Sequence, residues 1–98
     1  LYLDTGAMYR AVAYAVLEQN AAGDKKKIIE VAKNSVIELI GEPDSLQVLL
    51  NGKDISGLIR TNEVGQMASI VSTVSEVRRI LVRRQQELGL RGTGCVLD

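Results

Sequence analysis

The pair Asn51-Gly52 constrains the fold of this 98-residue sequence more than any other feature. Asn-Gly between two apolar runs is the strongest short signal for a β-hairpin with a type I′ turn, because both residues tolerate a positive φ. It joins predicted strands at 46–50 and 53–55, and a β-branched run at 36–40 precedes them across the turn-forming stretch GEPD. The sequence therefore predicts a three-stranded antiparallel meander over about residues 36–55, and we see no chemistry on this hairpin.

Helical periodicity precedes the meander. Apolar residues recur on one face from about residue 7 to residue 19, with Met8 and Val12 among them, which predicts an amphipathic helix. Asp24 is then placed to cap the N-terminus of a second helix, which turns Ile28 and Ala32 inward. Two helices are thus expected before the first strand.

Helical periodicity returns after the meander. Thr61 or Asn62 is expected to cap a third helix, in which Ser69 points away from the apolar stripe. Ser75 is expected to cap a last helix that runs from Glu76 to about Leu88. A loop is predicted from there to residue 94.

The two ends of the chain are apolar and almost free of charge. Leu1–Leu3 and Cys95–Leu97 are predicted to be short buried strands, since strands covered on both faces have this composition. The chain has no initiator Met, and both of its ends fall within these strands, so we interpret it as an internal segment of a longer protein. The expected fold class is α/β, in one domain over residues 1–98.

Composition excludes several functional classes. Hydrophobic residues make up 46% of the chain, enough for a core, while 12 basic and 12 acidic residues cancel, so no global field attracts nucleic acid or a membrane. A single cysteine cannot form an internal disulfide, and there is no His for a triad or a metal site. There is no transmembrane run and no signal peptide, and the single cysteine fits a reducing cytosol, so we expect a cytoplasmic protein. We also expect a monomer without a metal site, although the sequence itself leaves the oligomeric state open.

The first ten residues, LYLDTGAMYR, carry the first chemical motif. A strand that enters a helix through a tight turn at Asp4–Gly6 leaves backbone N–H groups free to bind an anion. Arg10, about one helical turn further, adds a fork of donors suited to a phosphate. Strand, turn, helix and arginine together predict a phosphate-binding motif.

Asp-Thr-Gly at residues 4–6 is also the signature of aspartic proteases. That interpretation requires the aspartate deep inside an all-β chain, after earlier strands and hairpins. Here the motif stands near the first residue and a long helical pattern follows it. The mismatch of element types disfavours a protease.

The last predicted helix carries the second chemical motif, the arginines Arg78, Arg79, Arg83 and Arg84. Such a cluster can bind phosphate or nucleic acid, but no aromatic residues are interleaved for base stacking. Most of these side chains are equally explained as the solvated surface of a helix. The alternatives left open are a small RNA- or protein-interaction module that uses this helix, and a folded domain that binds nothing measurable.

Three segments together resemble the bacterial cytidylate kinase family: LDTGAMYRA, DISGLIRTNEV with ASIVS, and EVRRILVRRQQ. The resemblance extends across the chain and implies the nucleoside-monophosphate-binding region, in which 36–55 is an antiparallel insert. It also implies that the two terminal strands lie side by side in the parallel core of a P-loop kinase. The phosphate loop G-x-x-x-x-G-K-[ST] does not occur in these residues, and the family's lid is likewise expected to lie elsewhere.

Carried over residue by residue, the resemblance implies six substrate-binding residues: Thr5, Tyr9, Arg10, Arg60, Ser69 and Arg78. Thr5 and Arg10 would face the monophosphate, and Tyr9 would lie beside the base or the sugar. Arg60 would help to position the site. Ser69 and Arg78 would hydrogen-bond the cytosine edge, which offers acceptors and an amino donor.

The activity implied by the resemblance is transfer of the ATP γ-phosphate to CMP or dCMP, which gives CDP or dCDP. ATP and Mg²⁺ would be cofactors of the full-length enzyme, and neither would bind to this segment. We therefore expect no catalytic residue here, no binding of nucleic acid, and no kinase activity of the segment alone. The preference among CMP, dCMP and UMP stays open.

Overall fold

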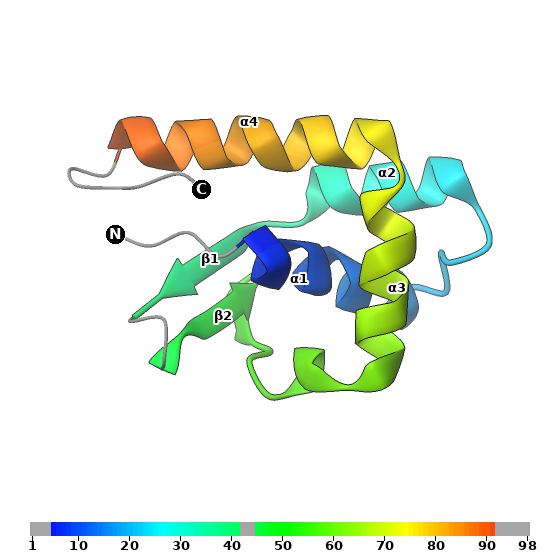
Figure 1. Ribbon diagram of the computed structural model, residues 1–98, viewed down its shortest axis with the longest axis horizontal. Coiled ribbons are helices and arrows are strands. Elements are labelled where there is room, and N and C mark those ends of the chain that lie inside the picture. The colour runs from blue at the N-terminus through cyan, green and yellow to red at the C-terminus, as the bar shows by residue number, and fades with distance from the viewer. Residues whose placement is uncertain (1–4, 42–44, 92–98) are drawn as a thin grey trace.

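The computed structural model describes residues 5–41 and 45–91, and the side chains of residues 6–41 and 45–86. Within these ranges, helices and one antiparallel sheet alternate along the chain (Figure 1). The elements are α1 (Thr5–Glu18), α2 (Lys25–Asn34), β1 (Ile37–Ile40), β2 (Gln47–Leu50), β3 (Lys53–Asp54), the 3-10 helix η2 (Leu58–Arg60), α3 (Asn62–Ser72) and α4 (Ser75–Arg91). The prediction of helices packed with a three-stranded antiparallel meander is confirmed.

The sheet has the order β1-β2-β3, with Ile37 opposite Leu50 and Leu50 opposite Lys53. At the turn between β2 and β3, Asn51 has φ 51° and Gly52 has φ 85°, as a type I′ turn requires. The predicted hairpin is therefore confirmed.

Each strand is one residue shorter than predicted, because Val36, Leu46 and Ile55 fall outside the regular ladder. Two of them still pair. The N–H of Val36 donates to Asn51 Oδ1 at 2.9 Å, and the N–H of Ile55 donates to the Val48 carbonyl at 2.9 Å. The bond of Ile55 continues the β2–β3 pairing by one residue, and at Val36 a side-chain oxygen serves as the acceptor.

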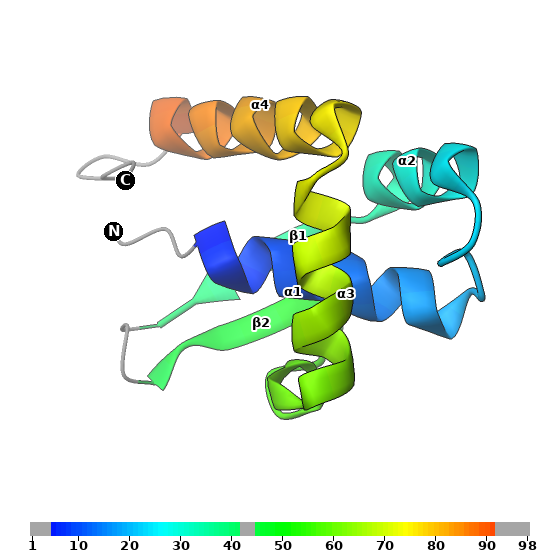
Figure 2. The ribbon, with the colours of Figure 1, turned by 45° about the vertical axis from the view of Figure 1, so that its right-hand side comes forward.

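Helix α1 lies at the centre of the molecule, where it contacts α2, α3, η2 and β2 (Figure 1). Its predicted inward face is buried, and Ala13, outside that face, is buried as well. A helix that is apolar nearly all round needs neighbours on all sides. Figure 2 shows α3 crossing α1, and the alanines of α1 permit a close approach there.

Helix α1 begins two residues earlier than predicted, so the expected turn at 4–6 is wrong for Thr5 and Gly6, which are helical. Asp24 caps α2 as predicted, because its carboxylate accepts from the N–H groups of Lys26 at 2.9 Å and Lys27 at 3.4 Å. At the other end of α2, the buried Ser35 hydroxyl donates to the Val31 carbonyl at 2.6 Å. Hydrogen bonds of side chains thus define both ends of this helix.

Thr61 caps α3, since its hydroxyl accepts from the N–H of Val64 at 3.2 Å. Ser75 is instead the first residue of α4, and its hydroxyl donates to the Glu76 carboxylate at 2.7 Å, so its prediction as a flanking cap is wrong. Helix α4 also runs to Arg91, past the predicted end at Leu88. Gly89 lowers helix stability by only about 1 kcal/mol relative to Ala, which does not stop the helix.

The remaining predictions on the ends of the chain lie outside the described residues. They are the strands Leu1–Leu3 and Cys95–Leu97 and the last three residues of the predicted 89–94 loop. The parallel kinase core that these strands would join stays a prediction. No helix in the described part of the chain has the length and apolarity to cross a membrane.

Candidate functional site

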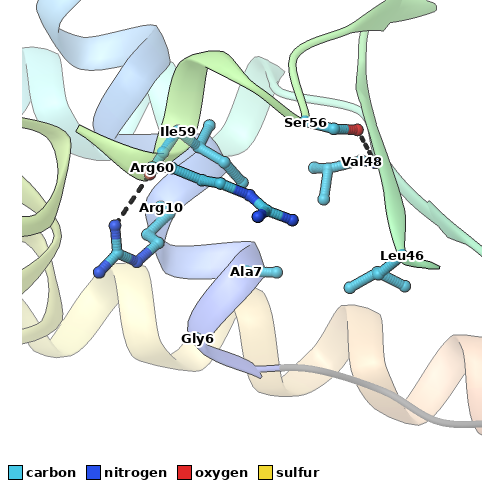
Figure 3. A pocket seen from close by; sticks show the side chains of 8 residues that line it. All are labelled: Gly6, Ala7, Arg10, Leu46, Val48, Ser56, Ile59 and Arg60. Atoms are coloured by element: carbon cyan, nitrogen blue, oxygen red, sulfur yellow. Dashed lines mark hydrogen bonds between the residues drawn. The ribbon is translucent and has the colours of Figure 1, made fainter. Parts of the chain in front are cut away.

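A cavity of about 340 Å³ opens beside the first turns of α1 (Figure 3). It lies between this helix, the start of the hairpin and η2. Its walls combine apolar side chains with two arginines, and the lining residues are Gly6, Ala7, Arg10, Leu46, Val48, Ser56, Ile59 and Arg60. Two of the predicted site residues, Arg10 and Arg60, thus come together here although η2 is distant from α1 in sequence.

Arg10 is half-buried and held by the protein. Its Nη1 donates to the Ile59 carbonyl at 2.9 Å, as the dashed line in Figure 3 shows. Its Nη2 lies so close to α3 that a Cβ added to Gly65 would be 3.4 Å away. The guanidinium is therefore fixed between η2 and α3, and its other N–H groups remain as donors for a ligand.

Arg60 points in a different direction. This exposed residue ends η2, and Figure 3 shows its guanidinium extending into the space between Ala7 and Val48. The Arg10 guanidinium turns away from that space toward its partner on η2. The two cations therefore line different parts of the cavity, with Arg60 over the apolar wall and Arg10 beside α3.

The start of α1 adds backbone donors to the same region. Gly6 is exposed, lines the cavity and has no side chain to cover the helix terminus. The first turn of α1 contains no acidic residue, so no carboxylate repels an incoming anion from that turn. Thr5 is the first residue of α1, and the role predicted for its side chain lies outside the described part of the structure.

Tyr9 and Arg78 form a second group of predicted site residues. Tyr9 is half-buried, and burial raises the pKa of its phenol, while the positive charge of Arg78 lowers this pKa. The charge of Arg78, on α4, therefore acts on the phenol of Tyr9, on α1. Arg78 itself is exposed, so its guanidinium is open to a ligand.

Ser69 lies on α3, one helical turn after the glycine that contacts Arg10. Its hydroxyl donates to the Gly65 carbonyl at 3.3 Å, a long hydrogen bond at an exposed position. The oxygen keeps its capacity to accept a hydrogen bond. Because Gly65 supports the guanidinium of Arg10, Ser69 and Arg10 share one side of α3.

The structure thus separates the predicted residues into two groups. Arg10 and Arg60 line the cavity, whereas Tyr9, Ser69 and Arg78 do not. Arg10 connects the two groups, since it touches the cavity on one side and α3 on the other. This arrangement can bind the anionic group of a ligand in the cavity and a ligand ring with hydrogen-bonding groups near α3 and α4.

Several residues of the site were missed by the sequence reasoning. No hairpin residue was expected there, yet Leu46 and Val48 form part of the cavity wall. The Ile59 carbonyl and Gly65, which hold Arg10, were missed as well. Only Gly65 gave a signal, because a glycine inside an amphipathic helix often marks a close approach of another group.

Metal-binding residues do not cluster in the part of the chain that the structure describes. No group of three or more His, Cys, Asp or Glu side chains there could hold a metal ion. The chemistry of the described site therefore depends on cations, backbone N–H groups and hydroxyls.

Comparison with known proteins gives the family. The model of the family described as Cytidylate kinase matches residues 1–98. The chain is 44% identical over 99 residues to the cytidylate kinase of Bacillus subtilis (strain 168) and 48% identical to that of Bacillus cytotoxicus, with 100% of this chain and 44% of each relative covered. The chain thus spans less than half the length of these relatives. On this match along its whole length, the chain belongs to the cytidylate kinase family.

Proposed function

We propose that this chain is the acceptor-nucleotide-binding segment of a kinase that transfers the ATP γ-phosphate to CMP or dCMP. The observation that carries the proposal is the guanidinium of Arg10, fixed between the Ile59 carbonyl and Gly65 beside a helix N-terminus. A donor fork that is already ordered loses little entropy when a phosphate binds. Relatives named cytidylate kinase over the same residues support the choice of substrate.

The monophosphate is assigned to the cavity. Arg10 and Arg60 supply positive charge, and the N-terminus of α1 supplies backbone donors. The predicted contact of Thr5 with the phosphate belongs to the same end of α1. The apolar wall formed by Leu46 and Val48 is suited to the carbon face of the sugar rather than to another charge.

The cytosine ring is assigned to the second group of residues. Arg78 can donate to the carbonyl oxygen and the ring nitrogen of cytosine, and Ser69 can accept from the amino group. Tyr9, whose phenol is within the electrostatic influence of Arg78, offers a ring face or a hydroxyl. A base that cannot complete these hydrogen bonds leaves polar groups unpaired as the site closes, which gives discrimination.

ATP and Mg²⁺ belong to the proposed full-length enzyme. The 98 residues contain no G-x-x-x-x-G-K-[ST] motif, and the described residues show no acidic cluster for a metal. The residues of the proposed nucleotide site do not fit a site for a metal-bound triphosphate, so we derive no transfer step from them. We expect no ADP above a blank when the chain is incubated with ATP, Mg²⁺ and CMP, and ADP formation would contradict this.

The nucleotide preference of the chain tests the proposal. Isothermal titration of the 98-residue chain with CMP, UMP and AMP compares ligands that share one phosphate and differ in the base. We expect CMP to bind, weakly but more tightly than AMP, because only a cytosine edge satisfies Arg78 and Ser69 together. Equal affinity for CMP and AMP, or no binding of either, would contradict the proposed function.

A further inference from the structure

A second arginine-rich cavity, of about 510 Å³, lies between the C-terminal end of α2 and the middle of α4. It shares no lining residue with the cavity beside α1. Its lining residues are Lys33, Arg79, Ile80, Arg83 and Arg84. All three arginines here belong to the cluster on α4, and the proposed nucleotide site uses only the fourth member of that cluster, Arg78.

No described residue neutralises the positive charge of this second cavity. Four of its lining residues are cations, none is acidic, and among the described residues none of the four makes an ion pair. The charge of Arg79 acts on the carboxylate of Glu76, whose pKa is lowered mainly by the Ser75 hydroxyl, with Lys25 and Arg79 among the lesser causes. Glu76 is not one of the lining residues, and an anion in the cavity would relieve the repulsion among the cations.

Arg84 provides the second observation. Its Nη2 donates to the Lys33 carbonyl at 2.8 Å, which fixes the guanidinium at the C-terminal end of α2. Its Nη1 is buried and has no hydrogen-bond partner among the described residues. A buried charged donor without a partner is costly, and an anionic oxygen that reached it from the cavity would relieve this cost.

We propose that this cavity binds a small anion with two linked phosphoryl groups, either free pyrophosphate or the terminal phosphates of a nucleoside triphosphate. A phosphoryl group carries about −1.5 to −2 charges at neutral pH, so two of them roughly balance four cations. Arginine forks match phosphate oxygens in geometry. Among the described lining residues, Ile80 is the one apolar side chain and none is aromatic, so they offer a base no stacking surface and RNA is disfavoured.

The test is an NMR titration of the 98-residue chain with sodium pyrophosphate, orthophosphate and ATP at constant ionic strength. Pyrophosphate is expected to shift the amides of Lys33 and Arg79–Arg84 in a saturable way and to bind at least tenfold more tightly than orthophosphate. The double variant R79Q/R83Q should weaken pyrophosphate binding at least tenfold. The control K26Q/K27Q removes the same charge from exposed positions of α2 outside this cavity, and it should change the affinity less than twofold.

The titrations with ATP and with pyrophosphate distinguish between the two proposed ligands. Shifts of the same amides by ATP and by pyrophosphate assign the cavity to triphosphate ends, and a response to pyrophosphate alone assigns it to the free anion. Saturating CMP should leave pyrophosphate binding unchanged. Displacement of pyrophosphate by CMP, equal weakening in both double variants, equal affinity for orthophosphate, or binding of mixed RNA that pyrophosphate does not inhibit would each overturn the proposal.

Discussion

The two arginine-rich cavities are built on the same plan but have different walls. In each, one arginine donates to a backbone carbonyl, Arg10 to that of Ile59 and Arg84 to that of Lys33, and further cations extend beside it. The cavity beside α1 adds apolar walls, whereas the cavity beside α2 adds almost only charge. Under the two proposals, an arginine held by a backbone carbonyl marks each phosphate site, and the other lining residues decide whether a sugar can accompany the phosphate.

Arg10 and Arg84 also differ in which parts of the structure they stabilise. Arg84 places a positive charge at the C-terminal end of α2, where the helix dipole is negative, so it stabilises the fold in the absence of ligand. Arg10 donates to η2 and packs on α3 at Gly65, so it connects elements around the proposed nucleotide site. Removing Arg10 should therefore weaken CMP binding, and removing Arg84 should lower the stability of the fold.

The largest expected effect comes from exchanging these two arginines for methionine. Arg10→Met should lower the affinity for CMP by about 1.5–3 kcal/mol, the usual value of a hydrogen bond to a charged group. Arg84→Met should leave CMP affinity unchanged and lower the free energy of unfolding by about 0.5–2 kcal/mol, because the end of α2 loses its partner. Calorimetric titration measures the CMP affinity, and urea unfolding measures the free energy of unfolding. Equal losses of CMP affinity in the two variants would contradict the different roles of Arg10 and Arg84.

Substitutions at Gly65 test whether CMP binding depends on the position of the Arg10 guanidinium against α3. Gly65→Leu should displace the Arg10 guanidinium and weaken CMP binding by about 1–3 kcal/mol, since a phosphate contact is lost. Gly65→Ala is the matched control, because its Cβ would make an ordinary contact at 3.4 Å. The alanine should keep CMP binding and stabilise the helix by about 0.5–1 kcal/mol in urea unfolding. Equal CMP affinity in both variants would show that Arg10 does not depend on this contact.

A smaller loss is expected at the proposed base end of the site. Arg78→Ala should lower CMP affinity by about 1 kcal/mol, because an exposed arginine must first be ordered before it can bind. Arg79→Ala removes the neighbouring charge, which lines the second cavity, and should leave CMP affinity unchanged. The two variants are compared by titration with CMP, and an equal loss in both would assign the effect to charge alone.

The smallest expected effect is a change in the titration of Tyr9. Its pKa is raised by burial and lowered by Arg78, so Arg78→Ala should raise it further. Because the folded pKa exceeds the unfolded value of about 10, the contribution of this group to stability is present below that pH and is lost as pH rises through the folded pKa. Ultraviolet titration after replacing Tyr2 and Tyr14 with Phe measures the shift, and an unchanged pKa would contradict the proximity of Tyr9 and Arg78.

The types of the elements followed from local signals in the sequence. Asn51-Gly52 adopts the positive φ angles of its turn, and Asp24 and Thr61 cap the helices that they precede. The end of α4 could not be located in this way, because one glycine costs too little to stop a long helix. Local chemistry thus predicts the kind of element better than its last residue.

The residues of the proposed phosphate site were predictable only in part. Arg10 and Arg60 were expected at the site from the resemblance, and the structure places both in one cavity. The Ile59 carbonyl and the contact at Gly65 could not be predicted, because they depend on how α1, η2 and α3 pack together. Every residue has a backbone carbonyl, so residue types alone do not tell which carbonyl accepts a hydrogen bond from a given arginine.

The most direct measurement of the central claim is amide chemical-shift mapping of the 98-residue chain during a CMP titration. We predict saturable shifts of the amides at Gly6–Arg10 and Ile59–Arg60, around the cavity beside α1, and at Gly65–Ser69 and Arg78, on α3 and α4. All of these shifts should give the same affinity for CMP. The amides of Lys33 and Arg83, in the second cavity, should not move. Saturable shifts confined to that second cavity, or no saturable shift along α1 and α3, would contradict the account.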